Sequence, residues 1–230
     1  MENGRVRVLE ADPGLLEAVP SDSRTAALEA LNAHALSSAP GPWAPDGLAR
    51  ASGLGILVLD GLLTRNVEIA GTRSREILGA GDVLRPWDDD SALDPLPSTT
   101  SWTVLEAARF AVLDQRWRVL AARWPDLGAE ILRRVVRRSR WLAVLLAIAN
   151  TRGVDGRVLL LFWHLAGSWG RVTPAGTLVP FGLTHEVIAD LVGARRPSVT
   201  TALAGLERAG ELERLADGWL LRGDPPLSAG

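Results

Sequence analysis

The chain has 230 residues, a net charge of −2 and 47% hydrophobic residues, which allows one large domain or two smaller ones. It contains no cysteine, which excludes disulfides, thiolate zinc sites and cysteine-ligated iron–sulfur clusters. No apolar run approaches the ~20 residues of a membrane span, and the N-terminus lacks a signal-peptide pattern. We therefore expect a cytoplasmic protein without a membrane partner. The overall charge gives no argument for nucleic acid, so any such case depends on local features.

The N-terminal part, residues 1–113, predicts a small β-domain. A short helix is expected over 22–34. Residues 55–70 and 102–114 each indicate two short strands around a turn, and 71–84 indicates another strand that ends in a glycine-bounded turn. Short strands at roughly even spacing are typical of a β-sandwich or barrel.

Residues 114–152 predict one long helix. Six positions follow alternating steps of three and four, the pattern of a heptad seam. They are Leu132, Val135, Ser139, Leu142, Leu146 and Ala149. The arginines at 133–140 lie mostly off this seam; a solvated helix face is the simplest interpretation, and contact with a partner subunit or an anionic ligand is the alternative. One apolar seam beside a small β-domain predicts a parallel helix-pair homodimer. Gly153–Gly156 breaks the helix and marks the expected hinge.

The C-terminal part predicts a winged helix-turn-helix. Thr184 is a good N-cap for a helix that ends at Gly193. Arg195–Pro197 opens a second helix, because proline fits only in a first turn. Two helices of this length around a short glycine-containing turn form the helix-turn-helix pattern. A helix and a hairpin over 157–181 precede them, and two strands over 211–223 follow as the wing.

The second helix of this motif carries the expected DNA contacts. Its N-terminal residues meet base edges in the major groove, where arginine binds guanine through O6 and N7. Small hydroxyl side chains can approach phosphates or bases closely. The predicted contacts are Arg195, Arg196, Ser198, Thr200 and Thr201, with Thr184 and His185 from the first helix. For His185, an ordinary surface residue of the first turn is an equal alternative.

The local charge leaves a second interpretation of the module open. Over residues 180–222 there are five arginines and six acidic residues, so the segment is slightly negative. Helix–turn–helix–hairpin modules also serve as protein-interaction domains. A ligand-sensing or scaffolding protein whose winged helix binds protein is therefore the alternative to a DNA-binding transcription regulator.

The stretch LTHEVIADLVGARRPSVTTALAGLERAGELE at 183–213 resembles the cyclic-AMP receptor/fumarate-nitrate regulator (CRP/FNR) family of bacterial transcription factors. ILVLDGLLTR followed by ILGAGDVL is similar to the family's barrel strands and to the turn before its phosphate-binding cassette. The resemblance implies an α+β chain: an N-terminal β-barrel or jelly-roll sensor domain (1–113), a long dimerisation helix (114–152) and a C-terminal winged helix-turn-helix (153–230). It also implies a homodimer on a pseudo-palindromic operator in double-stranded DNA, with RNA polymerase as a further candidate partner.

The resemblance also assigns roles within the second helix. Arg196 takes the place of the family's base-contacting arginine. Pro197 stands where the family has an acidic base contact, and Thr201 where it has a second arginine. The operator is therefore expected to differ from the best-known family sequence.

The sensor half departs from the family's cyclic-nucleotide cassette. That cassette uses a glutamate for the ribose and an Arg-Ser/Thr pair for the cyclic phosphate, whereas here Arg85–Trp87 and Thr99–Thr100 occupy those places. Because the cation for the phosphate is missing, we expect no tight binding of cyclic AMP in the usual way. Another effector, of unknown identity, is possible in principle, and a pocket filled by side chains is the alternative. The candidate effector residues are Arg85, Trp87, Thr99, Thr100 and Trp102.

Residues for other chemistry are few. Asp88–Asp90 is contiguous and lacks the alternation of a calcium loop, so a solvated acidic turn is the better interpretation. His34, His164 and His185 lie in three different segments without metal-ligand spacing, and His164 is expected to be an interior residue. There is no phosphate-binding loop and no nucleophile elbow. We expect a protein that is not an enzyme and that has no metal or cofactor.

Overall fold

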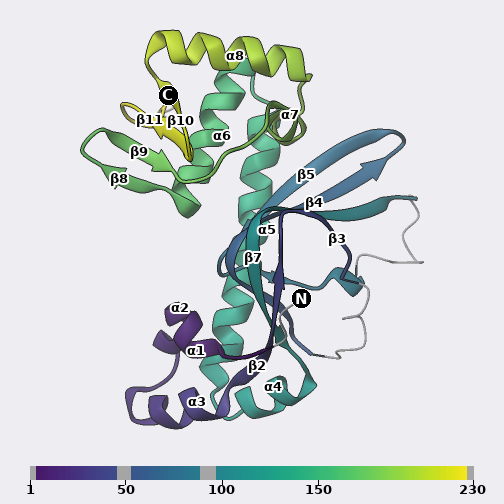
Figure 1. Ribbon diagram of the computed structural model, residues 1–230, viewed down its shortest axis with the longest axis vertical. Coiled ribbons are helices and arrows are strands. Elements are labelled where there is room, and N and C mark those ends of the chain that lie inside the picture. Colours follow the sequence, from purple (N-terminus) through teal and green to yellow (C-terminus); the bar gives the residue numbers. More distant parts are fainter. Residues whose placement is uncertain (1–3, 46–52, 89–96, 227–230) are drawn as a thin grey trace. The chain divides into compact units, whose positions relative to one another are not determined.

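The computed structural model describes residues 4–45, 53–88 and 97–226 (Figure 1). The chain forms two compact units, Met1–Arg140 and Trp141–Gly230, and each is described by itself. The boundary between them falls inside one long helix, α5 (Pro125–Ala149). The predicted division into three segments is not tested by this boundary and stays a prediction.

The first unit contains one antiparallel sheet. Its strands are β1 (Gly4–Arg7), β2 (Asn32–Ser38), β3 (Gly41–Trp43), β4 (Gly55–Ile69), β5 (Thr72–Gly79), β6 (Val83–Leu84) and β7 (Thr99–Leu113). The order is β1-β2-β7-β4-β5, with β3 on β7 and β6 on β4. The long strands β4 and β7 pair along their length in the middle of the sheet. β1, β2 and β3 lie on the β7 side, and β5 and β6 lie on the β4 side.

The prediction of two short strands in each of the segments 55–70 and 102–114 is wrong. The first segment is the single strand β4, because the Asp60–Gly61 pair forms an irregularity within it instead of a hairpin turn. The second segment belongs to the single strand β7, which pairs with β4. Gly61 has a φ of +86°, and a Cβ there would lie 2.4 Å from the carbonyl oxygen of Ala107. Only glycine fits this left-handed position beside the neighbouring strand.

Both faces of β4 are buried, which explains its nearly continuous apolar sequence. Ile56 and Val58 contribute to one core, and the alternating Leu57 belongs to the other. The first core contains a cluster of large aromatic rings. Trp43 stacks on Phe110 with 4.8 Å between ring centres. The second core is covered by the helices of this unit.

These helices are α1 (Val8–Ala11), α2 (Pro13–Glu17), α3 (Arg24–Ala30), α4 (Gln115–Ala121) and the first part of α5, with 3-10 turns η1 (Ser21–Ser23) and η3 (Pro86–Asp88). The predicted helix over 22–34 ends early, and His34 lies in β2. The predicted single helix over 114–152 is two helices. Asp114 caps α4 by accepting the Trp117 N–H at 2.8 Å, and Pro125 starts α5 in a new direction.

The arginines of α5 correct a further expectation. Arg134 and Arg138 do not lie on a solvated face: only 7% and 15% of their side chains are exposed. Arg134 pairs with Asp12 and Glu130, and Arg138 pairs with Glu76 of β5 at 2.5 Å. Buried arginine is retained where carboxylates compensate its charge. The Arg138–Glu76 pair attaches α5 to the sheet of its own unit, and the Arg134–Asp12 pair attaches it to the N-terminal helices.

The second unit contains α6 (Val154–Trp169), β8 (Arg171–Thr173), β9 (Gly176–Val179), α7 (His185–Val192), α8 (Arg196–Ala209), β10 (Leu212–Leu215) and β11 (Gly218–Leu221). The four strands form a sheet in the order β10-β11-β9-β8. Helix α6 begins at Val154, so the helix break lies just before the predicted one. Phe162 and Trp219 meet in the core with 4.9 Å between ring centres. No helix in the described part of the chain is long and apolar enough to span a membrane.

Candidate nucleic-acid interface

Helices α7 and α8 form the predicted helix-turn-helix. The hydroxyl oxygen of Thr184 accepts the Val187 N–H at 3.2 Å, which caps α7. Gly193 ends α7 in the left-handed conformation with a φ of +62°. The chain then extends through Arg195 into α8, where Pro197 sits in the first turn. The predicted N-cap and C-terminal glycine of α7 and the predicted first-turn position of Pro197 in α8 are confirmed.

Packing sets which face of α8 is exposed. The predicted inner residues of α7 and α8 are buried: Val187, Ile188, Leu191, Val199, Leu203 and Leu206. Because they hold one side of α8 against the unit's core, the opposite side faces solvent. The predicted contact residues Arg195, Arg196 and Ser198 are exposed at the start of α8.

A contact between α7 and α8 involves two of the predicted residues. The Nδ1 atom of His185 lies 2.9 Å from Oγ1 of Thr200. The Thr200 hydroxyl also donates to the Arg196 carbonyl oxygen at 3.1 Å, so the same oxygen has partners on both helices. The sequence placed both residues at the interface but did not predict this link. It fixes the His185 ring beside the first turns of α8.

Arg157 is a residue that the sequence analysis missed. Its guanidinium donates to the carbonyl oxygen of Thr151 at 2.6 Å and to those of Val192 and Gly193 at 3.3 Å. These carbonyls include the end of α7, where the turn into α8 begins. Arg157 thus positions that turn from the first turn of α6. The sequence signal is a single arginine in a largely apolar helix.

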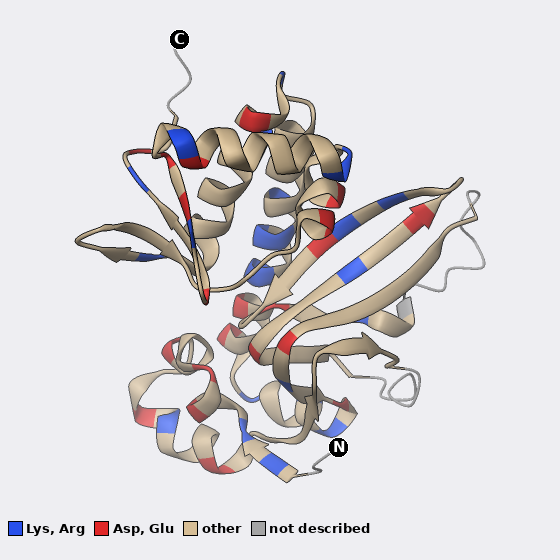
Figure 2. Cartoon of the chain, turned by 45° about the horizontal axis from the view of Figure 1, so that its top comes forward, with Lys and Arg blue, Asp and Glu red and all other residues tan. Residues whose placement is uncertain are grey.

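The charges of this unit are unevenly placed. In Figure 2 the ribbon of α8 is tan between its N-terminal end and its last turns, which agrees with the absence of charged residues between Arg196 and Glu207. Glu207 and Glu211 lie at the opposite end of the helix from Arg196. The N-terminal end of α8 is therefore the part with a positive charge, as a groove contact needs.

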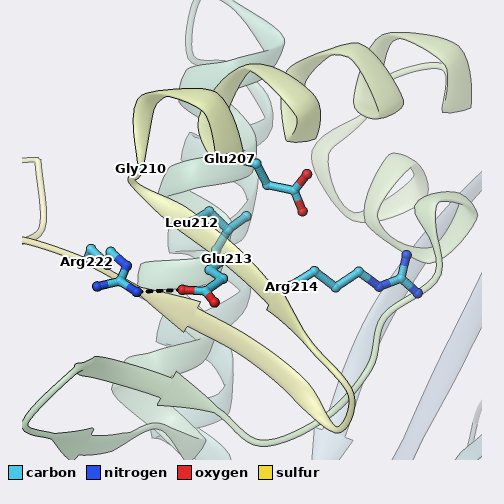
Figure 3. A pocket seen from close by; sticks show the side chains of 6 residues that line it. All are labelled: Glu207, Gly210, Leu212, Glu213, Arg214 and Arg222. Carbon is cyan, nitrogen blue, oxygen red and sulfur yellow. Dashed lines mark hydrogen bonds and ion pairs between the residues drawn. The ribbon is translucent and has the colours of Figure 1, made fainter.

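A small pocket lies at the wing, between the end of α8 and β10 (Figure 3). It has a volume of about 270 Å³ and is lined by Glu207, Gly210, Leu212, Glu213, Arg214 and Arg222. Arg222 is paired with Glu213 at 2.6 Å, and the guanidinium of Arg214 lies 5.6 Å from the ring centre of Trp219. Sequence analysis gave no sign of this pocket. Its mixed charge does not favour an anion.

The candidate effector residues lie in different parts of the sheet. Trp102 is buried in the aromatic core, and Trp87 packs against the same core. Thr99 and Thr100 pair with Glu68 and Val67, near the C-terminal end of β4.

Arg85 lies away from this end of β4. It follows β6, which pairs with the N-terminal end of β4. Its Nη1 donates to the Gly53 and Leu54 carbonyl oxygens at 2.9 and 3.3 Å. Asp89 and Asp90 lie outside the described residues. Among the described residues there is no cluster of three or more histidines or carboxylates that could hold a metal.

Helix α5 carries the predicted seam and a second apolar face. Its inner face contains buried residues at steps of three and four, in which two ion-paired arginines interrupt the apolar side chains: Leu127, Ile131, Arg134, Arg138, Trp141, Leu145 and Ile148. Leu132 and Leu146 of the predicted seam are 63% and 66% exposed, and Val135 is 50% exposed. Leu142 and Ala149 are partly buried beside the inner face. Ser139 is exposed on the same side as Leu132 and Leu146.

The fold and the capped helix pair define a winged helix-turn-helix protein with an N-terminal β-domain. Residues 156–222 match the family described as Crp-like helix-turn-helix domain. A relative from Mycobacterium tuberculosis, "CRP-like cAMP-activated global transcriptional regulator", is 33% identical over 135 residues. The match covers 58% of this chain and 59% of that relative, so it spans less than two thirds of the relative's length.

Solved structures share the fold. A cyclic nucleotide-binding domain containing protein from Listeria monocytogenes has a TM-score of 0.64 at 15% identity, covering 81% of this chain and 87% of its own. A CooA variant from Carboxydothermus hydrogenoformans has a TM-score of 0.59 at 16% identity, covering 95% and 91%. CprK complexed with OCPA has a TM-score of 0.57 at 17% identity, covering 94% and 89%. The chain thus contains a Crp-like helix-turn-helix domain over residues 156–222 and is similar over 58% of its length to a CRP-like regulator.

Proposed function

We propose that the chain is a homodimeric transcription regulator that binds a specific duplex DNA sequence through the N-terminal end of α8. One observation carries the proposal: Arg195 and Arg196 are exposed at the N-terminal end of α8, directly after the turn that follows α7. In helix-turn-helix proteins this end of the second helix meets base edges. The name of the M. tuberculosis relative as a transcriptional regulator supports the proposal.

The test is selection of bound sequences from random duplex DNA by the full chain, followed by a salt titration of the best site. Affinity for the site should fall linearly with the logarithm of salt concentration, because binding releases counterions from the phosphates. The slope should be shallow, since the acidic residues at the end of α8 and in the wing limit the number of phosphate contacts. A chain that enriches no sequence would contradict DNA recognition.

The exposed face of α5 supports the homodimer. Leu132, Val136 and Leu146 are each at least 60% exposed, although α5 already buries another face in its own chain. A helix with two apolar faces is typical of one that packs on its own domain and on a second helix. We propose that the seam consists of Leu132, Val135, Val136, Ser139 and Leu146, with Leu142 and Ala149 at its margin. A two-fold dimer would bind two half-sites about one helical turn apart.

For the sensor we propose that the sheet does not bind cyclic AMP in the usual way. In the aromatic core Trp43 contacts both Trp102 and Phe110, and Arg85 already donates to two backbone carbonyls. Calorimetry of the chain with cyclic AMP and cyclic GMP should show no binding at micromolar concentrations. Micromolar or tighter affinity for either nucleotide would overturn this part of the proposal.

Binding of a protein by the winged helix is the second candidate. It is favoured by the acidic residues of the wing region, among them Glu207, Glu211 and Asp217, which would repel phosphates. The same DNA selection separates the two functions, because a module that binds only protein enriches no duplex. An enriched sequence with a salt-dependent affinity excludes this candidate.

A further inference from the structure

We propose that the outer face of α8 recognises the C5-methyl groups of thymines, next to a guanine bound by Arg196. This inference rests on the proposed DNA binding and names the base-pair chemistry that the site selects. The outer face consists of Pro197, Thr201 and Ala204.

The three residues of the outer face lie on one side of α8. They follow each other at steps of four and three, which places them in one stripe along a helix. All three are exposed, whereas Val199 and Leu203 on the opposite side are buried. The outer face is therefore the part of α8 that enters the major groove when the N-terminal end of the helix does.

The hydroxyl of Thr201 is already used within the helix. It donates to the Pro197 carbonyl oxygen at 3.2 Å. A hydroxyl that is turned back to the preceding turn leaves the Cγ2 methyl as the group that projects from the helix. The outer face thus consists of a proline ring, a methyl group and the Ala204 methyl group.

The hydroxyl of the neighbouring Thr200 also has partners within the protein. The Thr200 hydroxyl donates to the Arg196 carbonyl oxygen, and its oxygen lies 2.9 Å from Nδ1 of His185. Between Arg196 and Glu207 the helix has no charged residue, and this part of α8 is uncoloured in Figure 2. The outer face therefore has little capacity to donate hydrogen bonds to guanine or to pair with phosphates.

Among the base edges of the major groove, the thymine C5-methyl group is the one that favours apolar contact, and threonine methyl and alanine side chains are its typical partners. Arg196 at the start of the same helix can bind guanine through O6 and N7. The expected half-site therefore contains a guanine, which Arg196 contacts. One or more thymines should lie next to it, where the outer face of α8 meets the groove.

The first experiment replaces thymine by uracil in the site that the full chain selects. Uracil lacks only the C5-methyl group and keeps every hydrogen-bonding group. Each thymine under the outer face should lose roughly fourfold in affinity per half-site, the equivalent of ~0.8 kcal/mol for one buried methyl group. Uracil at thymines outside the half-sites is the control and should leave affinity unchanged. Equal affinity for the thymine and uracil sites would overturn the inference.

A matched pair of variants locates the contact on α8. Thr201→Ser keeps the hydroxyl and removes the methyl group, whereas Thr201→Val keeps a methyl group and removes the hydroxyl. Thr201→Ser should bind the thymine site roughly fourfold more weakly and no longer distinguish it from the uracil site at one position. Thr201→Val should keep that distinction. The reverse result would show that the hydroxyl makes the contact and would overturn the inference.

The inference and the proposed function fail in different ways. If no duplex is enriched, DNA recognition itself is wrong and the outer face has a protein partner or none. If a duplex is enriched but its thymine methyl groups do not affect affinity, the proposed function stands and only the thymine contact is wrong. Thermal unfolding of both Thr201 variants should match that of the unmodified chain, because the side chain is exposed.

Discussion

The guanidinium of Arg134 and the carboxylate of Asp12, 122 positions apart in sequence, form a two-pronged ion pair. The Nη1 and Nη2 atoms of Arg134 lie 2.5 and 2.9 Å from the two carboxylate oxygens. Both side chains are nearly buried, with 7% and 11% of their surface exposed. Arg134 also contacts Glu130 and the Gly81 carbonyl oxygen. One arginine of α5 therefore connects the N-terminal helices with the β5–β6 turn.

Loss of the Asp12 charge should destabilise the first unit. Asp12→Asn leaves Arg134 buried with one acidic partner fewer, which should cost roughly 3 kcal/mol in free energy of unfolding. Urea unfolding followed by tryptophan fluorescence measures this. Asp60→Asn is the matched control, because Asp60 and Arg109 form an exposed pair that should contribute less than ~1 kcal/mol. Similar losses in the two variants would show that the Asp12–Arg134 pair has no special role.

Asp82 should make stability depend on pH. Burial raises its pKa above the ordinary value of 3.8, an effect that attraction by Arg138 offsets only in part. Because the folded state then binds the proton more tightly than the unfolded state, this carboxyl's contribution to stability falls as pH rises from about 4 through the raised pKa. Asp82→Asn should therefore gain stability relative to the unmodified chain as pH increases over that window.

The measurement for Asp82 is urea unfolding of both chains at several pH values between 4.5 and 7.5. The asparagine can still accept the Gly79 N–H that Asp82 accepts at 2.9 Å, so the turn should be retained. Asp82→Asn can also carry a fixed cost from the loss of the carboxyl 3.9 Å from Arg138, so the change of the stability difference with pH is the quantity that tests the prediction. A difference between the two chains that does not change with pH would contradict the prediction.

The α5 seam gives a test of the dimer. Leu132→Glu with Leu146→Glu places charges on the two most exposed leucines of the helix, so the variant should be monomeric in analytical ultracentrifugation. It should also bind the selected DNA far more weakly, because one half-site is then bound at a time. Arg137→Glu is a control on the same helix, away from the seam. An unchanged sedimentation mass in the double variant would rule out this interface.

Local chemistry made the second unit predictable. Thr184, Gly193 and Pro197 each have a strong positional preference, as N-cap, left-handed C-cap and first-turn residue, and together they set both helices of the motif. Val199 and Leu203 are apolar and four residues apart, which marks the buried side of α8. The opposite side is therefore the exposed one. The hydrogen bonds of Arg157 were not predictable, because its partners are backbone carbonyls of α7 and of the segment after α5.

The first unit was harder to predict, because its turn-like and charged sequence patterns each fit more than one structure. Asp60–Gly61 is typical of a hairpin turn, but here it is an irregularity within β4. The strand continues because it pairs with β7 on both sides of this dipeptide. The arginines of α5 gave a similar error. An arginine next to an apolar seam is usually solvated, and only the folded chain shows that Arg134 meets Asp12 and Arg138 meets Glu76.

Arg196 should determine one base pair of each half-site. Arg196→Ala removes the side chain that can bind guanine through two acceptors, so affinity for the selected site should fall by ~1–3 kcal/mol per contact. Sequence preference should be lost at that position alone, which a second selection with the variant measures. The Arg196 carbonyl oxygen that accepts from Thr200 remains in the alanine variant, so the contact between α7 and α8 should survive.

Arg208→Ala is the matched control for this prediction. Arg208 lies in the last turn of the same helix and its Nε donates to the Ala204 carbonyl oxygen at 3.1 Å. Because it is far from the N-terminal end of α8, its removal should leave sequence preference unchanged and alter only the salt dependence of binding. If Arg196→Ala behaves like Arg208→Ala, with affinity reduced evenly for all sequences, Arg196 contacts phosphate and the guanine must be bound by another residue.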